Sequence, residues 1–346
     1  MPLMRAVQIA SPGADFQLVK KEIPEPRAHE IRIRVEACGV CRGDTLVKEG
    51  HFPGLQYPRV PGHEVVGLID RCGTNLVSDW EVGQRVGVGW YGGPCLKCSA
   101  CRRGDLGRGQ NIMATGISFD GGYAEYMVAP MQAFVKIPSE ITPTEAAPLL
   151  CAGRTTFEAV RSSGARGGDL VAVLGLGGLG HLAIQFARKF GCRTVALSRG
   201  REKEQLAYQL GAHLYVDTEA AQPGEELRKL GGARVILATA PSGRAISDVI
   251  NGLGNDGQLY LLAMQNEPIQ VSPLQLARGG RSIRGSMGRF VSGSVEDTLS
   301  FSVLSGIRPM VETFSLDQAS EAYEKMMSAR VHFRSVLVPG MSPAGG

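Results

Sequence analysis

The chain lacks several features that would place it at once in a broad class of proteins. The most apolar stretch, residues 170–187, is broken by glycines and a histidine and is not a membrane span. No basic run is interleaved with aromatic residues, and a net charge of +4 gives no reason to expect nucleic acid. Because residues 1–16 contain no apolar segment typical of a secretory signal, we expect a cytoplasmic protein.

Marks of disorder and of internal repeats are also missing. Of the 346 residues, 43% are hydrophobic and 20% are charged, which permits a sizeable core. The length exceeds that of one small domain and fits two. The eight cysteines suggest metal binding or catalysis, because clustered cysteines in a cytosolic enzyme rarely form disulfides.

The expected elements divide the chain into two parts. Short strands at residues 30–36, 64–70, 85–88 and 123–128, separated by Gly and Pro turns, indicate an antiparallel, barrel-like domain. From residue 170 onward, strands and amphipathic helices alternate, which indicates a parallel, doubly wound sheet. Two helices and a last strand at about 333–338 lie outside this alternation, and that strand could return to the first domain.

A glycine-rich turn follows the first strand of this alternation. Gly175, Gly177 and Gly180 form the pattern G-x-G-x-x-G, with Gly178 and Leu179 inside it. The first glycine permits a tight turn, the second lets the backbone approach a pyrophosphate, and the third lets helix and strand pack closely. Because the helix N-terminus that follows supplies N–H donors to phosphate, we expect a dinucleotide site here.

The second strand of the alternation lacks the carboxylate that usually binds the ribose 2′-hydroxyl of NAD. Its end carries Ser198, Arg199, Arg201 and Lys203 instead. Arginine recognises phosphate through a planar fork of donors, so this stretch favours a 2′-phosphate over a merely solvated basic helix start. We therefore expect NADP(H) as the cofactor.

Two thiols and one imidazole stand in distinctive local frames. Cys41 lies in Gly-Val-Cys-Arg-Gly-Asp, His63 in Pro-Gly-His-Glu, and Cys151 in Leu-Leu-Cys-Ala-Gly. Two thiolates and an imidazole suit Zn²⁺, and three protein ligands leave the fourth position open, as in a catalytic zinc site. A Lewis acid and a dinucleotide site in one chain point to hydride transfer at an oxygen-bearing carbon.

Taken together, these motifs resemble those of zinc-containing alcohol dehydrogenases of the medium-chain dehydrogenase/reductase superfamily, in the same order. The resemblance implies a GroES-like antiparallel β-barrel catalytic domain of residues 1–149 and 290–346. It also implies a Rossmann domain, a doubly wound parallel sheet of residues 150–289 that binds NADP(H). The active site would lie in the cleft between them, and relatives suggest a homodimer or homotetramer.

The resemblance also implies roles for the residues around the metal. Cys41, His63 and Cys151 match the three ligands of the catalytic zinc. Glu64 matches a carboxylate beside the metal that ligates it transiently in this family. Asp44 matches the acid that holds the zinc-bound imidazole, and such partners tune the metal.

The chain departs from the family pattern at the proton relay. Gly43 stands where relatives usually carry Ser or Thr, whose hydroxyl contacts the substrate oxygen. Leu46 replaces a histidine often seen in the relay, and His51 is the candidate substitute. Water, His51 or the substrate itself would then have to protonate the product oxygen.

A second departure concerns the structural zinc of the family. Cys95, Cys98 and Cys101 match three of its four cysteines, but Gly109 stands at the position of the fourth. Structural zinc is almost always four-coordinate. Either Asp105 or water completes the site, or the lobe holds no metal.

The residues and the resemblance together predict an NADP(H)-dependent zinc alcohol dehydrogenase or carbonyl reductase for a small-molecule alcohol/carbonyl pair. Loss of the relay hydroxyl leaves open a second activity, the reduction of activated C=C or C=N bonds. A cofactor-binding protein without activity is a third alternative. The retained Cys-His-Cys set argues against it, because a pure binder needs no open metal site.

Overall fold

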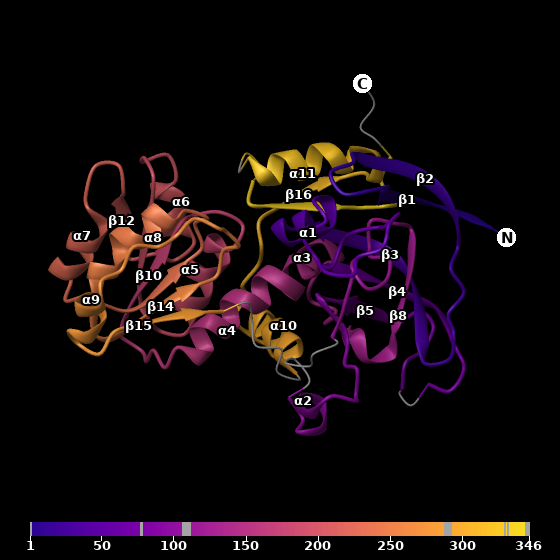
Figure 1. Cartoon of the computed structure of the whole chain (residues 1–346), viewed down its shortest axis with the longest axis horizontal. Coiled ribbons are helices and arrows are strands. Elements are labelled where there is room, and N and C mark those ends of the chain that lie inside the picture. Colours follow the sequence, from indigo (N-terminus) through magenta and orange to yellow (C-terminus); the bar gives the residue numbers. More distant parts are fainter. Residues whose placement is uncertain are drawn as a thin grey trace. The chain divides into compact units, whose positions relative to one another are not determined.

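The computed structural model divides the chain into two compact bodies, shown in Figure 1. The first body comprises Met1–Cys151 and Phe290–Gly346, and the second comprises Ala152–Arg289. The structure describes residues 2–76, 79–105, 112–286, 293–328, 330 and 332–342. Within these residues, no helix is both long and apolar enough to cross a membrane.

The first body is built on a seven-stranded sheet with the order β16-β17-β3-β4-β5-β9, in which β8 also pairs with β3. All neighbouring pairs are antiparallel except β16 and β17. The first body also contains two two-stranded sheets, β1-β2 and β6-β7. The strands of this body are β1 (Leu3–Ile9), β2 (Phe16–Glu22), β3 (Glu30–Val40), β4 (Val65–Cys72), β5 (Arg85–Val88), β6 (Tyr91–Gly93), β7 (Met113–Ala114), β8 (Tyr126–Pro130), β9 (Phe134–Lys136), β16 (Val311–Phe314) and β17 (Arg334–Leu337). Its helices are α1 (Thr45–Lys48), α2 (Ser99–Arg102), α3 (Pro143–Pro148), α10 (Ser294–Ser305) and α11 (Ala319–Met327), with short turns η1 (Arg42–Asp44), η3 (Met131–Ala133), η4 (Leu149–Gly153) and η6 (Leu316–Gln318).

Strand β3 shows how the sequence pattern becomes a core and then a site. In its first half, Ile31 and Ile33 are fully buried while Arg32 and Arg34 are at least partly exposed, so one face packs inward. From residue 37 to residue 40 every side chain is buried. The strand therefore delivers Cys41, which follows it directly, into the interior of the body.

The C-terminal part of the chain returns to this sheet. β17 pairs antiparallel with β3, with Leu337 opposite Cys38 and Ser335 opposite Val40. The last strand thus pairs with a strand from the N-terminal part of the chain. As a result, Arg334 lies near the end of β3, where Cys41 begins the next turn.

The second body is a six-stranded parallel sheet with the order β12-β11-β10-β13-β14-β15. Its strands are β10 (Leu170–Leu174), β11 (Arg193–Ser198), β12 (Leu214–Asp217), β13 (Ala233–Ala238), β14 (Leu253–Leu261) and β15 (Ser282–Gly285). Its helices are α4 (Arg154–Ser162), α5 (Gly180–Lys189), α6 (Glu204–Gln209), α7 (Pro223–Lys229), α8 (Gly243–Val249) and α9 (Pro273–Ala277), with the short turn η5 (Ile250–Gly252). The order reverses at β10, as in doubly wound dinucleotide-binding sheets, so the predicted α/β fold class is confirmed.

Helix α5 covers the central strand β10. Leu182, Ala183 and Phe186 are fully buried on one face of the helix, and all five residues of β10 are buried. Gly180 begins α5, and a Cβ at this position would lie only 1.9 Å from the carbonyl oxygen of Gly175. The contact is with backbone, which has little freedom to move away, so helix and strand can approach this closely only with glycine here.

We predict that Gly180→Ala lowers the stability of the protein by about 1–3 kcal/mol or more, because the added methyl group overpacks the turn. Gly177→Ala is the matched control, since a Cβ there would meet nothing within 4 Å. Urea unfolding followed by circular dichroism measures both. Equal midpoints for the two variants would contradict the proposed close packing.

Candidate functional site

Three separate segments of the first body bring the predicted ligands together. Cys41 caps the turn η1 after β3, His63 and Glu64 immediately precede β4, and Cys151 lies in the π-helical turn η4. One ligand atom from each of the four residues lies within 4.8 Å of those of the others. We call these four residues the ligand group.

The spacing of the two sulfur atoms fits a metal centre. The Sγ atoms of Cys41 and Cys151 are 4.0 Å apart. Two sulfur atoms that are each about 2.3 Å from a tetrahedral zinc would lie roughly 3.8 Å apart. Only a small adjustment is therefore needed for both thiolates to bind one zinc ion.

The imidazole of His63 is held by a buried carboxylate on its Nδ1 side. Its Nδ1 is 2.9 Å from Oδ1 of Asp44, and both side chains are almost completely buried. Tyr123 donates its hydroxyl to Oδ2 of Asp44 at 3.0 Å, and the backbone N–H of Cys41 donates to the same oxygen at 2.9 Å. On the other side of the ring, Nε2 is buried and has no hydrogen-bond partner among the described residues.

Gly43 leaves room for this imidazole. A Cβ at position 43 would lie 2.9 Å from Cε1 of His63 and 3.4 Å from the ring of Trp90. Trp90 itself meets His63 edge to face, with ring centroids 4.9 Å apart. A side chain at position 43 would require the imidazole ring to shift. The position of the ring therefore depends on the glycine that replaces the relay residue.

Glu64 has a partner that sequence reasoning missed. Nη2 of Arg334 lies 2.5 Å and 2.7 Å from the two carboxylate oxygens, and both side chains are buried. Gly39 provides the space, since a Cβ there would lie 1.9 Å from Oε2 of Glu64. The available signal was an arginine within the apolar run at residues 333–338, since arginine is almost never fully buried unless it is paired.

Mutual contacts shift the pKa values of the ligand group. The hydrogen bond between the two thiols lowers the pKa of Cys41 well below its usual value, and the same contact raises the pKa of Cys151. Burial opposes the charged form of His63, but Asp44 and Cys41 together raise its pKa well above the usual value. Burial raises the pKa of Glu64 to about 7, although the guanidinium of Arg334 acts in the opposite direction.

The second predicted metal site is a compact cluster of three sulfur atoms. The Sγ atom of Cys101 is 3.7 Å from that of Cys95 and 3.5 Å from that of Cys98. The described residues with ligand atoms within 4.8 Å of one another here are these three cysteines, and Asp105 does not belong to the group. Gly109, the position of the missing fourth cysteine, lies outside the described residues.

His51 lies apart from the ligand group. Its side chain is 63% exposed, and Nδ1 is 3.2 Å from Oε2 of Glu49. It is not among the described residues whose ligand atoms gather around Cys41. An exposed imidazole beside a carboxylate can exchange protons with solvent, so a role in proton transfer is chemically open to it.

The glycine-rich turn of the second body has the geometry of a dinucleotide site. Gly175 adopts a φ of +94° directly after β10, a conformation that favours glycine. A Cβ at Gly177 would meet no atom within 4 Å, so the space beside this glycine is open. Gly178 and Leu179 then lead into the first turn of α5. The turn can therefore approach a phosphate closely, as the sequence pattern predicts.

The residues expected around a 2′-phosphate lie at the end of β11. Ser198 is the last residue of the strand, and Arg199 follows it with an exposed side chain. Lys203 donates from Nζ to the carbonyl oxygen of Leu176 at 3.1 Å, which places its ammonium group beside the glycine-rich turn. Two cationic side chains thus flank the carboxyl ends of β10 and β11.

The bodies and their sites define the class of the protein, an oxidoreductase of the medium-chain type. Residues 27–139 match the family "Alcohol dehydrogenase GroES-like domain", and residues 178–303 match the family "Zinc-binding dehydrogenase". The chain belongs to the zinc-type alcohol dehydrogenase family of the medium-chain dehydrogenase/reductase superfamily. This confirms the family expected from the motifs.

Named relatives agree with this assignment. The chain is 42% identical to the alcohol dehydrogenase patD of Penicillium expansum, over 94% of each chain. It is 41% identical to the alcohol dehydrogenase notN of Aspergillus sp. (strain MF297-2), over 90% of this chain and 91% of the relative. These likenesses support an alcohol dehydrogenase-type activity on small molecules.

Solved structures share the whole fold. An NAD-dependent alcohol dehydrogenase superposes with a TM-score of 0.89 at 26% identity, over 97% of this chain and all of the other. A protein of Sinorhizobium meliloti 1021, described as a zinc-binding dehydrogenase and solved with NADP, gives 0.88 at 26% identity, over 98% of this chain and all of the other. The structural relatives thus include users of both dinucleotides.

We predict that Arg334→Met destabilises the protein by about 3–5 kcal/mol, because it leaves the Glu64 carboxylate buried without its partner. The double variant Arg334→Met/Glu64→Gln should recover part of this loss, since it no longer contains the unpaired charge. Urea unfolding of both variants measures the difference. A double variant less stable than Arg334→Met would show that the ion pair does not account for the effect.

Proposed function

We propose that this protein is a zinc-dependent alcohol dehydrogenase or carbonyl reductase that transfers hydride between NADP(H) and an alcohol/aldehyde or alcohol/ketone pair. The observation that carries the proposal is Nε2 of His63, buried without a partner among the described residues beside the two thiols of the ligand group. A buried acceptor left unsatisfied costs about 1–3 kcal/mol. A metal ion bound at this nitrogen would remove that cost.

The donor set fits zinc in kind as well as in spacing. Cys41, His63 and Cys151 would hold the ion, and Glu64 is close enough to exchange with an incoming ligand. When bound, zinc supplies a Lewis acid that polarises the C–O bond of the substrate. Cys95, Cys98 and Cys101 would hold a second ion without a catalytic role, through three thiolates and water.

The residues around the ligand group prepare it for this role. Asp44 accepts from Nδ1 of His63, which fixes the tautomer with the lone pair on Nε2. Arg334 binds both oxygens of Glu64 and so holds this carboxylate in place. The contact between the Sγ atoms of Cys41 and Cys151 lowers the pKa of Cys41, so the first thiolate of the pair forms readily.

Protonation of the product oxygen cannot use a hydroxyl at position 43, because the residue there is glycine. Water, His51 or a group on the substrate would supply the proton instead. The exposure of His51 and its contact with Glu49 support proton exchange with solvent.

NADP(H) is favoured as the dinucleotide by the cations at the end of β11. Arg199 is exposed and free to bind a phosphate, and Lys203 already lies beside the glycine-rich turn. Ser198 stands where NAD-binding sheets usually carry a carboxylate, so residue 198 itself brings no negative charge against a 2′-phosphate. NADPH preference would make carbonyl reduction the working direction.

We predict that the purified protein contains at least one zinc ion per chain and that Cys151→Ala removes one equivalent. Loss of a thiolate ligand should also abolish NADPH-dependent reduction of an enal to the allylic alcohol. Elemental analysis gives the metal content, and product analysis gives the reaction. Cys98→Ala is the matched control, because it changes the other thiol cluster and should leave the reduction intact.

Two outcomes would count against this proposal. A folded protein without zinc that still binds NADPH would leave the ligand group without its proposed metal. Formation of the saturated aldehyde from the enal would assign the reaction to the C=C bond instead of the carbonyl. Either result would favour the alternative reductase activity.

We predict that Arg199→Ala lowers kcat/KM for NADPH by about tenfold or more and leaves that for NADH nearly unchanged. Loss of one charge-assisted hydrogen bond to the 2′-phosphate accounts for the change, since such bonds contribute about 1.5–3 kcal/mol. Arg193→Ala, at the opposite end of β11, is the control and should change neither value. A wild-type preference for NADH would contradict the 2′-phosphate interpretation.

A further inference from the structure

A pocket lined by three arginines lies in the second body. Its volume is about 230 Å³. The residues that line it are Arg228, Asn251, Ser272, Leu274, Gln275, Arg278 and Arg281. None of them is acidic, so three formal positive charges face this small volume without a carboxylate in its wall. Three guanidinium groups around one small volume create a positive local potential, which favours binding of an anion there.

The pocket and the glycine-rich turn lie at opposite ends of the parallel strands. Arg228 belongs to α7, which leads into β13, Asn251 belongs to η5, which leads into β14, and Arg281 immediately precedes β15. All three therefore lie at the amino ends of parallel strands. Gly175 follows the carboxyl end of β10, where dinucleotides bind in such sheets. The pocket is thus separate from the proposed NADP(H) site.

One wall of the pocket is held together by hydrogen bonds of side-chain amides, a guanidinium and the backbone. Gln275 donates from Nε2 to Oδ1 of Asn251 at 3.0 Å, and its Oε1 accepts from the backbone N–H of Ser272 at 2.7 Å. Arg281 donates from Nη1 to the carbonyl oxygen of Gln275 and from Nε to that of Gly254, both at 3.4 Å. These bonds orient the guanidinium of Arg281 and leave its Nη2 without a hydrogen bond to any described residue.

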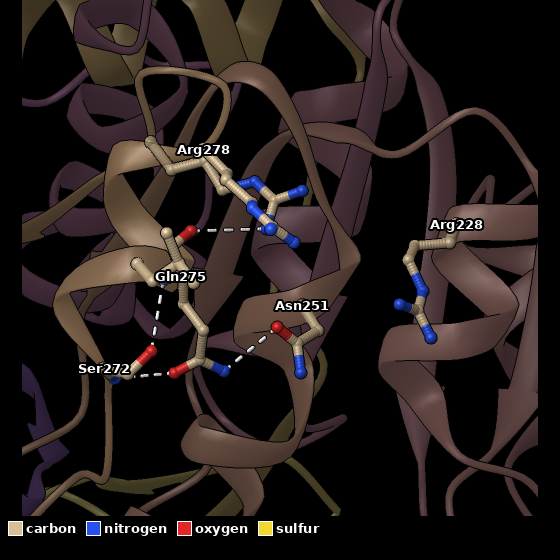
Figure 2. Close-up of a pocket in the computed structure, with 7 residues that line it drawn as sticks. Arg228, Asn251, Ser272, Gln275 and Arg278 are labelled. Carbon is tan, nitrogen blue, oxygen red and sulfur yellow. Dashed lines mark hydrogen bonds between the residues drawn. The ribbon is translucent and has the colours of Figure 1, made fainter.

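Arg278 and Arg228 also have guanidinium N–H groups that are available to bind a ligand. The side chain of Arg278 makes no hydrogen bond or ion pair with the described part of the chain. Nη2 of Arg228 is 3.4 Å from Oε1 of Glu225, but both side chains are more than half exposed, so solvent weakens this pair. Figure 2 shows Arg228 on one side of the pocket and Gln275 and Arg278 on the other, with Asn251 between them.

We propose that this pocket binds a small molecule carrying two or more linked phosphate groups. Guanidinium groups bind phosphate oxygens through paired, charge-assisted hydrogen bonds. Three of them on opposite walls suit a ligand with several negative charges distributed along its length, such as a diphosphate or triphosphate. The amide of Asn251 and the hydroxyl of Ser272 add neutral groups that can bind the remaining oxygens.

The test is calorimetric titration of the full-length protein with sodium pyrophosphate and sodium triphosphate at constant ionic strength. NADPH and NADH are both present in excess, so that the dinucleotide site is occupied. We expect saturable binding of one anion per chain. Arg278→Gln should weaken it roughly tenfold, the change expected for the loss of one charge-assisted hydrogen bond. Arg228→Gln should weaken it similarly.

Arg193→Gln is the matched control, because Arg193 is exposed at the amino end of β11 and does not line the pocket. It should leave the affinity unchanged. Equal binding of sulfate, equal effects of Arg278→Gln and Arg193→Gln, or the absence of saturation would overturn the proposal. Competition by duplex DNA that depends on Arg278 would also overturn it, in favour of a nucleic-acid surface.

Discussion

The carboxylate of Asp44 is the group on which the arrangement of the ligand group most depends. It is almost completely buried, and it accepts from the backbone of Cys41, the imidazole of His63 and the hydroxyl of Tyr123. A carboxylate buried without such donors would cost several kcal/mol. The three donors come from different segments of the chain. Their hydrogen bonds to the one carboxylate of Asp44 therefore fix these segments relative to one another. With Nδ1 held by Asp44, Nε2 of His63 faces away from this carboxylate and meets no hydrogen-bond partner among the residues that the structure describes.

A second buried charge extends this network across the sheet. Glu64 and Arg334 are 270 residues apart in sequence and meet because β17 returns to pair with β3. The ion pair makes the C-terminal segment part of the same site as Cys41. A buried pair of this kind contributes little net stability compared with an apolar pair of similar volume. Its presence therefore suggests a role in holding the Glu64 carboxylate beside Cys41, His63 and Cys151.

The two bodies use glycine for a common purpose, to let backbone or ligands approach where any other side chain would collide. Gly180 allows α5 to pack against the end of β10, and Gly39 leaves space for the carboxylate of Glu64. Gly43 is different, because relatives usually carry a hydroxyl there. In this chain, the glycine lets the imidazole of His63 and the ring of Trp90 lie close to the backbone. The loss of the relay hydroxyl is thus also a change in packing.

The sequence by itself determined the features that depend on local pattern. The alternation of strands and helices predicted the parallel sheet, the glycine spacing predicted the turn after β10, and the local frames of Cys41, His63 and Cys151 predicted which residues gather. Strand β15 and the partner of Glu64 were missed, because β15 (Ser-Ile-Arg-Gly) contains a single apolar residue and Arg334 has no local pattern linking it to Glu64. The tertiary structure alone decided that Nε2 of His63 has no hydrogen-bond partner in the described part of the chain and that three arginines meet at the amino ends of β13, β14 and β15. Both depend on contacts between segments far apart in the chain, which periodicity and spacing do not encode.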